Sequence, residues 1–77
     1  MKKVLVLGPG CAKCEELFSQ VQKAIAEMNI ECDLQKIKDI NEIMKYGVMF
    51  TPALVVDDQV KSSGKVLPVE EIKKHLA

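Results

Sequence analysis

The sequence has 77 residues, 48% of them hydrophobic, and eleven lysines balance eleven acidic side chains while arginine is absent. A chain of this length supports one small hydrophobic core, so we expect residues 1–77 to form a single, monomeric domain with one functional site. The balanced charge and the lack of arginine argue against nucleic acid, and no apolar run is long enough for a signal peptide or a membrane span, so we expect a cytoplasmic protein.

The first half of the chain predicts strand, helix and strand in that order. Residues 4–7 are continuously apolar, as in a central strand that is buried on both faces, and the segment 8–10 ends it with two glycines and a proline. Apolar residues then recur at spacings of three and four over residues 14–28, which predicts an amphipathic helix. Residues 30–35 alternate between apolar and polar side chains, which is typical of a strand at the edge of a sheet.

A short second helix is predicted after this edge strand. Asp39 and Glu42 resemble a capping box, and Gly47 can end the helix. Met44 and Met49 stand among apolar residues in this region, so we interpret them as gap-filling core residues rather than as metal ligands.

The last third of the chain predicts a hairpin and a final helix. Residues 53–56 form another apolar strand, and a two-residue turn leads into a polar strand at residues 59–61. Pro68 stands where a first-turn proline belongs, and apolar residues continue with helical spacing to the end of the chain. The predicted order is β-α-β-α-β-β-α, which is an α/β fold.

Two of the cysteines, Cys11 and Cys14, stand at the predicted junction between the first strand and the first helix. The unpaired N–H groups and the dipole of a helix start favour a thiolate, so we expect the pKa of Cys11 to be lowered, with Lys13 adding a nearby cation. Cys14 falls on the buried stripe of the helix. Thiol–disulfide exchange needs an exposed thiol that attacks and a shielded thiol that resolves the mixed disulfide, and we assign these roles to Cys11 and Cys14 respectively.

Three other interpretations of the pair remain open. A structural disulfide that closes so short a loop would stabilise the fold little. A closed zinc site would need two further ligands, for which only Cys32 and His75 are available, whereas Cu(I) could be held by the pair alone. The thiols could also be unreactive in a redox fold that serves as an interaction scaffold. Spacing and compartment favour redox chemistry over these alternatives.

The sequence Cys-Ala-Lys-Cys at residues 11–14, followed by Thr51-Pro52 on this succession of elements, resembles the small thioredoxin/glutaredoxin-like redox proteins of archaea and bacteria over the whole chain. The resemblance implies a minimal thioredoxin fold, a central four-stranded mixed sheet with helices on both faces. It also implies a cis Pro52 beside the cysteine pair and a Thr51 backbone that pairs with an extended substrate. Protein disulfides would be the substrates and a reductase the partner, with no metal and no cofactor besides a Cys11–Cys14 disulfide.

The chain departs from its better-known relatives around the cysteines. Gly10 stands where thioredoxins carry tryptophan, so we expect a flatter and less apolar docking surface, and no residues match the glutathione pocket of glutaredoxins. Heavy-metal-associated domains also carry a C-x-x-C sequence after their first strand, but their order is β-α-β-β-α-β. Topology therefore favours the redox protein, and a module that binds or delivers Cu(I) or Zn(II) through the same pair is the alternative.

Overall fold

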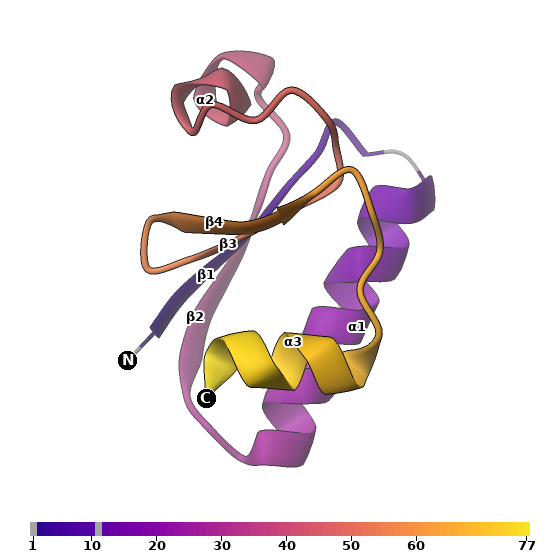
Figure 1. The fold of residues 1–77 in the computed structure, drawn as a ribbon, viewed down its shortest axis with the longest axis vertical. Helices are drawn as coiled ribbons and strands as arrows, with labels where there is room; N and C mark the ends of the chain where they lie inside the picture. The colour runs from indigo at the N-terminus through magenta and orange to yellow at the C-terminus, as the bar shows by residue number, and fades with distance from the viewer. Residues whose placement is uncertain (1, 11) are drawn as a thin grey trace.

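The structure, a computed structural model, describes residues 2–10 and 12–77, and Met1 and Cys11 lie outside the described residues. In chain order its elements are β1 (Lys2–Leu7), α1 (Ala12–Met28), β2 (Cys32–Ile37), α2 (Ile40–Lys45), β3 (Ala53–Val56), β4 (Gln59–Ser63) and α3 (Val69–Leu76), as labelled in Figure 1. This is the predicted β-α-β-α-β-β-α order.

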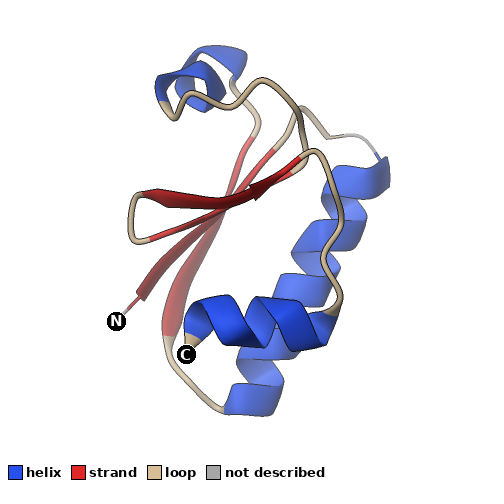
Figure 2. Ribbon diagram, in the orientation of Figure 1, coloured by secondary structure: helices blue, strands red, loops and turns tan. Residues whose placement is uncertain are grey.

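The strands form one mixed sheet with the order β2-β1-β3-β4 (Figure 2). β1 pairs with β2 in parallel and with β3 antiparallel, and β4 pairs antiparallel with β3. β1, which was predicted to be central and buried on both faces, is an inner strand, and so is the apolar strand β3. β2 is an edge strand with alternating burial, as predicted. The sequence pattern therefore predicted the positions of β1 and β2 in the sheet.

Four strand boundaries differ from those predicted, because β1 and β2 begin at other residues, and β2 and β4 each end two residues later, at Ile37 and Ser63. β1 begins at Lys2 rather than at residue 4, because its two lysines continue the parallel ladder although they are not apolar. β2 begins at Cys32 rather than at residue 30, because Asn29 has a φ of 53° and turns the chain after α1. Ladder hydrogen bonds and backbone turns decide such boundaries, and hydrophobicity does not report them.

Helices cover both faces of the sheet, as the resemblance implied. Side chains alternate along the inner strands, so successive residues face opposite sides. One face is packed by α1 and α3, and its buried residues are Val4, Val6, Leu17, Val21, Ala24, Leu54, Val56, Leu67, Ile72 and Leu76. The other face is packed by α2 and the segment after it, and its buried residues are Leu5, Leu7, Ile43, Val48, Ala53 and Val55.

The short helix α2 is fixed by its two ends. The Asp39 carboxylate accepts a hydrogen bond from the Asn41 N–H at 2.9 Å, which caps the first turn. Glu42 does not complete the predicted capping box but pairs with Lys45 at 3.0 Å. Gly47, with a φ of +73°, ends the helix as predicted, and its N–H donates to the carbonyl of Met44 at 2.9 Å.

The hairpin and the last helix also follow their sequence signals. Asp57 and Asp58 both have positive φ, which a two-residue hairpin turn between β3 and β4 requires. Pro68 lies at the N-cap of α3, one position earlier than predicted, and its carbonyl accepts from the N–H groups of Glu71 and Ile72. Among the helices formed by residues 12–77, none is long and apolar enough to cross a membrane.

Candidate functional site

The end of β1, the start of α1 and the segment before β3 meet at one end of the sheet (Figure 1). Leu7 is paired with Ala53, so the antiparallel register carries Gly8 toward the residues that precede β3. The N–H of Gly8 donates to the carbonyl of Ile37 at 2.9 Å and extends the pairing with β2. This end of the sheet therefore gathers the predicted site residues that the structure describes.

Gly8 lies close to the side chain of Cys14 at this end. A Cβ atom built on Gly8 would collide with the Sγ atom of Cys14, would lie 3.0 Å from the Cys14 Cβ and would lie 3.9 Å from the Thr51 Cβ. The sulfur thus occupies the space of the missing side chain. Cys14 is buried, with 2% of its surface exposed, as its place on the apolar stripe predicted.

The Thr51–Pro52 peptide bond is cis, as the resemblance implied. Pro52 is fully buried, and its carbonyl accepts a hydrogen bond from the N–H of Gly64 at 2.8 Å. Thr51 is half-buried, and the backbone hydrogen bonds outside helices and strands in the described residues include none to its N–H or carbonyl.

The other predicted members of the site are Cys11 and Lys13. Cys11 lies outside the described residues, so its assigned role as the attacking thiol stays a prediction. Lys13 lies in the first turn of α1 and is exposed to solvent. Its proposed influence on the thiols likewise stays a prediction.

A charged contact fixes the first turns of α1 to the edge of the sheet. The Lys36 ammonium on β2 lies 2.8 Å from a Glu15 carboxylate oxygen and 4.4 Å from the centroid of the Phe18 ring. The hydrogen bond from Lys36 holds the pKa of Glu15 below its usual range. Since Glu15 directly follows Cys14, this contact helps to hold the cysteine-bearing turn in place.

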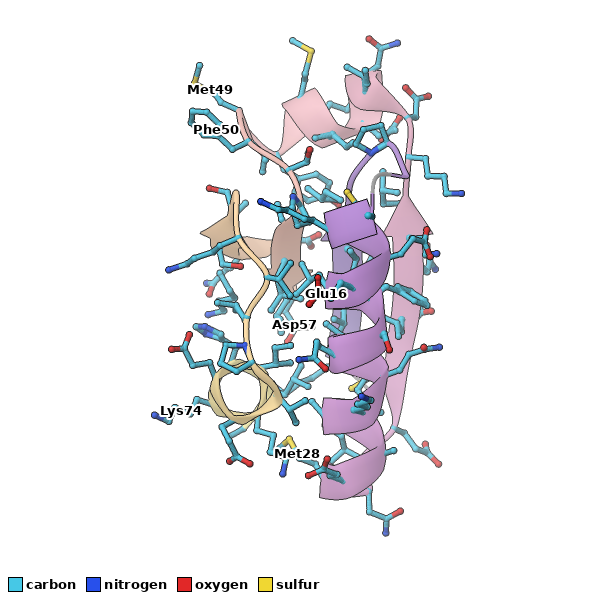
Figure 3. All side chains as sticks on the ribbon, turned by 90° about the vertical axis from the view of Figure 1, so that its right-hand side faces the viewer. Glu16, Met28, Met49, Phe50, Asp57 and Lys74 are labelled. Carbon is cyan, nitrogen blue, oxygen red and sulfur yellow. The ribbon has the colours of Figure 1, made fainter. Side chains whose placement is uncertain are left out.

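An apolar pocket of about 360 Å³ opens beside Thr51. It is lined by Pro9, Ile40, Ile43, Met44, Val48, Met49 and Thr51. Met44 is 66% exposed and Met49 is 88% exposed, so the interpretation of these two methionines as core residues is wrong. Figure 3 shows Met49 and the 68% exposed Phe50 projecting outward from the segment between α2 and β3.

These exposed side chains also correct the expected docking surface. The missing tryptophan does not leave this end of the molecule poor in apolar surface, because the segment between α2 and β3 supplies it instead. The sequence does not reveal the pocket, because Val48, Met49 and Phe50 form an apolar run that favours burial. The sequence signal for the pocket is Gly47. It follows α2 and leaves too few residues before β3 for another packed helix or strand.

Cys32 lies at the other end of the sheet. It begins β2 and pairs with Lys2, five ladder positions before the Leu7–Ile37 pair, which is about 16 Å at the rise of a parallel strand. The zinc site considered above is therefore not assembled from Cys14 and Cys32. Within residues 2–10 and 12–77, no three His, Cys, Asp or Glu side chains are grouped so that they could hold a metal ion.

Burial raises the pKa of the Cys32 thiol, with Asp57 acting in the same direction and Lys2 opposing it. We expect iodoacetamide to modify Cys32 more slowly in the folded protein than in the urea-unfolded chain, measured by mass spectrometry of its peptide.

The raised pKa of Cys32 also makes the free energy of unfolding depend on pH. As pH rises, the thiol ionises in the unfolded chain before it ionises in the folded protein. The contribution of Cys32 to the free energy of unfolding is therefore complete below the unfolded pKa and is lost as pH rises through the folded pKa. Cys32→Ala should therefore lessen the loss of stability at alkaline pH, and an unchanged alkaline limb would contradict this.

Comparison with known proteins places these features in one family. A family model described as a thioredoxin domain matches residues 2–77. A thioredoxin of Methanothermobacter thermautotrophicus is 38% identical over 77 residues, which cover all of both chains. A thioredoxin of Methanocaldococcus jannaschii is 38% identical over 76 residues, which cover 99% of this chain and 87% of the relative.

Proposed function

Because this chain belongs to the thioredoxin family, whose activity is that of a thiol–disulfide oxidoreductase, we propose that it reduces protein disulfides through Cys11 and Cys14. One observation carries the proposal. The Cys14 sulfur is buried against Gly8 at the turn that joins β1 to α1, within one helical turn of Cys11 in the sequence. A shielded thiol in that place suits the resolving role.

The proposed reaction has two exchange steps. The Cys11 thiolate attacks one sulfur of the substrate disulfide, which forms a mixed disulfide and releases the other substrate sulfur as a thiolate that takes up a proton. The Cys14 sulfur, after losing its proton, then attacks the Cys11 sulfur and releases the second substrate thiol. The pair loses two electrons and becomes a disulfide, the substrate gains two electrons and two protons, and a protein reductase of the cell restores the dithiol.

Lys13 and Thr51 have supporting roles in this proposal. The exposed ammonium of Lys13 favours the thiolate form of Cys11 through its charge. The backbone of Thr51 pairs with an extended segment of the substrate that brings the disulfide to Cys11. Neither role needs a metal or another cofactor.

Single-cysteine variants test the assignment of roles. We expect Cys11→Ser to abolish multiple-turnover reduction of a protein disulfide by dithiothreitol. Cys14→Ser should instead accumulate a covalent adduct with the substrate, seen as the summed mass in non-reducing mass spectrometry. Cys32→Ser is the matched control and should retain the wild-type rate. Full turnover by Cys14→Ser together with no adduct would overturn the assignment.

The reduction potential of the pair tests the direction of electron flow. Equilibration in glutathione redox buffers should give a single two-electron transition, and a potential near that of thioredoxin, about −270 mV, would indicate a reductant. A potential nearer −120 mV would indicate an oxidant. A pair that forms no disulfide at any potential would end the redox proposal.

The alternative function uses the reduced pair to hold Cu(I) or Zn(II) for delivery. Soft thiolates select Cu(I), and the pair alone would provide two-coordinate binding. Native mass spectrometry of freshly purified protein, with Cys11→Ser/Cys14→Ser as the control, separates the two functions. Stoichiometric metal that depends on both cysteines would favour delivery.

A further inference from the structure

Lys36 stands in a row of β2 side chains that otherwise faces the core. Alternate residues of a strand share one face of the sheet, so Lys36 lies in line with Cys32 and Leu34. Both of those residues pack against the cluster beneath α1 and α3. The Lys36 side chain is only 26% exposed, although a long charged side chain on an edge strand can extend into water. A cation is thus held against the first turns of α1.

Two partners on α1 hold the Lys36 ammonium in one place. Its nitrogen lies 2.9 Å and 2.8 Å from the two carboxylate oxygens of Glu15 and 4.4 Å from the centroid of the Phe18 ring. Glu15 and Phe18 are three residues apart on the helix and so lie on the same side of it. The hydrogen bond from Lys36 lowers the pKa of Glu15, and the charge of Lys38 acts in the same direction, so both members of the pair are charged at neutral pH.

The Glu15 carboxylate stands where its charge acts on the cysteine pair. It belongs to the first turn of α1, directly follows Cys14 and comes four residues after Cys11 in the sequence. In the proposed reaction the reduced pair carries a thiolate whereas the disulfide carries no charge, so a bare carboxylate here disfavours the reduced state. Lys36 cancels that charge. The exposed charges around this turn are those of Lys13, Glu16 and Lys38.

We infer that Lys36 is a positioning residue that holds the Glu15 carboxylate neutralised at the start of α1 and thereby raises the reduction potential of the cysteine pair. The inference rests on the proposed function, because it concerns the Cys11–Cys14 couple. Reduction of that disulfide takes up two electrons and one proton and yields one thiolate and one thiol. Lys36 favours the thiolate by removing a repulsive charge, without contact with the substrate.

Equilibration of the full-length protein in glutathione redox buffers at pH 7 measures the effect. Two glutathione thiols supply the two electrons, and acid quenching followed by thiol labelling gives the reduced fraction by mass. Lys36→Met keeps an unbranched side chain but leaves Glu15 bare, so the equilibrium should shift about two- to tenfold toward the protein disulfide. Glu15→Gln leaves the cation, so it should shift the equilibrium by a similar factor toward the dithiol. Such factors are expected for one unit charge near a protein surface.

The opposite signs separate a charge effect from a structural one. A contact that merely fixed the turn would weaken in both variants and would not move the equilibrium in opposite directions. The double variant Lys36→Met/Glu15→Gln should return close to the wild-type equilibrium, because both charges are absent. The shifts of the single variants should also shrink in 1 M KCl, where the Debye length falls to about 3 Å. Lys36→Gln, which also lacks the charge, should behave as Lys36→Met does.

A second ion pair of the chain supplies matched controls. Lys73 on α3 lies 2.6 Å from Glu27 on α1, and these side chains are 26% and 54% exposed, against 26% and 52% for Lys36 and Glu15. Glu27 stands about 18 Å farther along α1 than Glu15 at the rise of a helix. Lys73→Met and Glu27→Gln should therefore leave the glutathione equilibrium unchanged.

The outcomes distinguish this inference from the function on which it rests. Shifts of the same sign in Lys36→Met and Glu15→Gln, no shift in either, or shifts that persist in 1 M KCl would overturn the inference while leaving the redox function intact. Equal shifts in the Lys73 and Glu27 variants would overturn it as well. A wild-type pair that forms no disulfide in any of the buffers would instead refute the proposed function.

Discussion

Replacing Gly8 with alanine should lower the free energy of unfolding by about 1–3 kcal/mol, the usual cost of overpacking a close-packed site. The added methyl group would collide with the Cys14 sulfur and stand 3.0 Å from the Cys14 Cβ. Without this collision the sign would be opposite, because glycine-to-alanine changes at permissive sites stabilise by about 0.4–1 kcal/mol through the unfolded chain. Urea unfolding of the reduced protein, followed by circular dichroism, measures the difference.

A double-mutant cycle isolates the contact with sulfur. Cys14→Ala removes the Sγ atom, so Gly8→Ala should cost less in the Cys14→Ala background than in the wild type, by at least about 0.5 kcal/mol. The remaining cost would come from the contact between the two Cβ atoms. An identical cost in both backgrounds would show that the sulfur does not limit the space at Gly8.

Replacing Leu54 with alanine should destabilise the protein by about 2–5 kcal/mol, the range for deleting a buried leucine side chain. Leu54 is fully buried on the inner strand β3, and it packs in the same cluster as Val6 and Leu17. A domain of 77 residues typically has about 4–12 kcal/mol of stability in total. The variant should therefore unfold at a much lower urea midpoint, while the slope of the free energy of unfolding against urea concentration stays unchanged.

Leu34→Ala provides the matched control for this prediction. The same atoms are removed, but Leu34 is only partly buried on the edge strand β2 and borders the same cluster. Its cost should be clearly smaller, because the exposed part of the side chain already contacts water and the cavity can collapse. Equal losses in the two variants would contradict the description of β3 as the core strand of this face.

Much of the fold could be predicted from the sequence because local signals and tertiary environment agree. The continuous apolar run of β1 predicted a central strand, the apolar run of β3 predicted a further strand, and the alternating pattern of β2 predicted an edge. Boundaries were less accurate, since the positive φ of Asn29 and the ladder hydrogen bonds of Lys2 depend on backbone geometry.

The site could be predicted only in part. The helical spacing predicted a buried Cys14, and the resemblance supplied a cis Pro52. Gly8 was read merely as the end of a strand, because its role depends on a sulfur six residues away that packs across the turn. The pocket was missed for a related reason, since exposure at Met44 and Met49 is decided by the path of the chain after α2.

The C-cap residue of α2, Tyr46, has a consequence for spectroscopy. Tyr46 is the only tyrosine of a chain without tryptophan, and it packs, partly buried, against the cluster that contains Ile43 and Val48. Both of those residues also line the pocket. Intrinsic ultraviolet fluorescence therefore comes from a single side chain, which packs against the cluster that holds two of the residues lining the pocket.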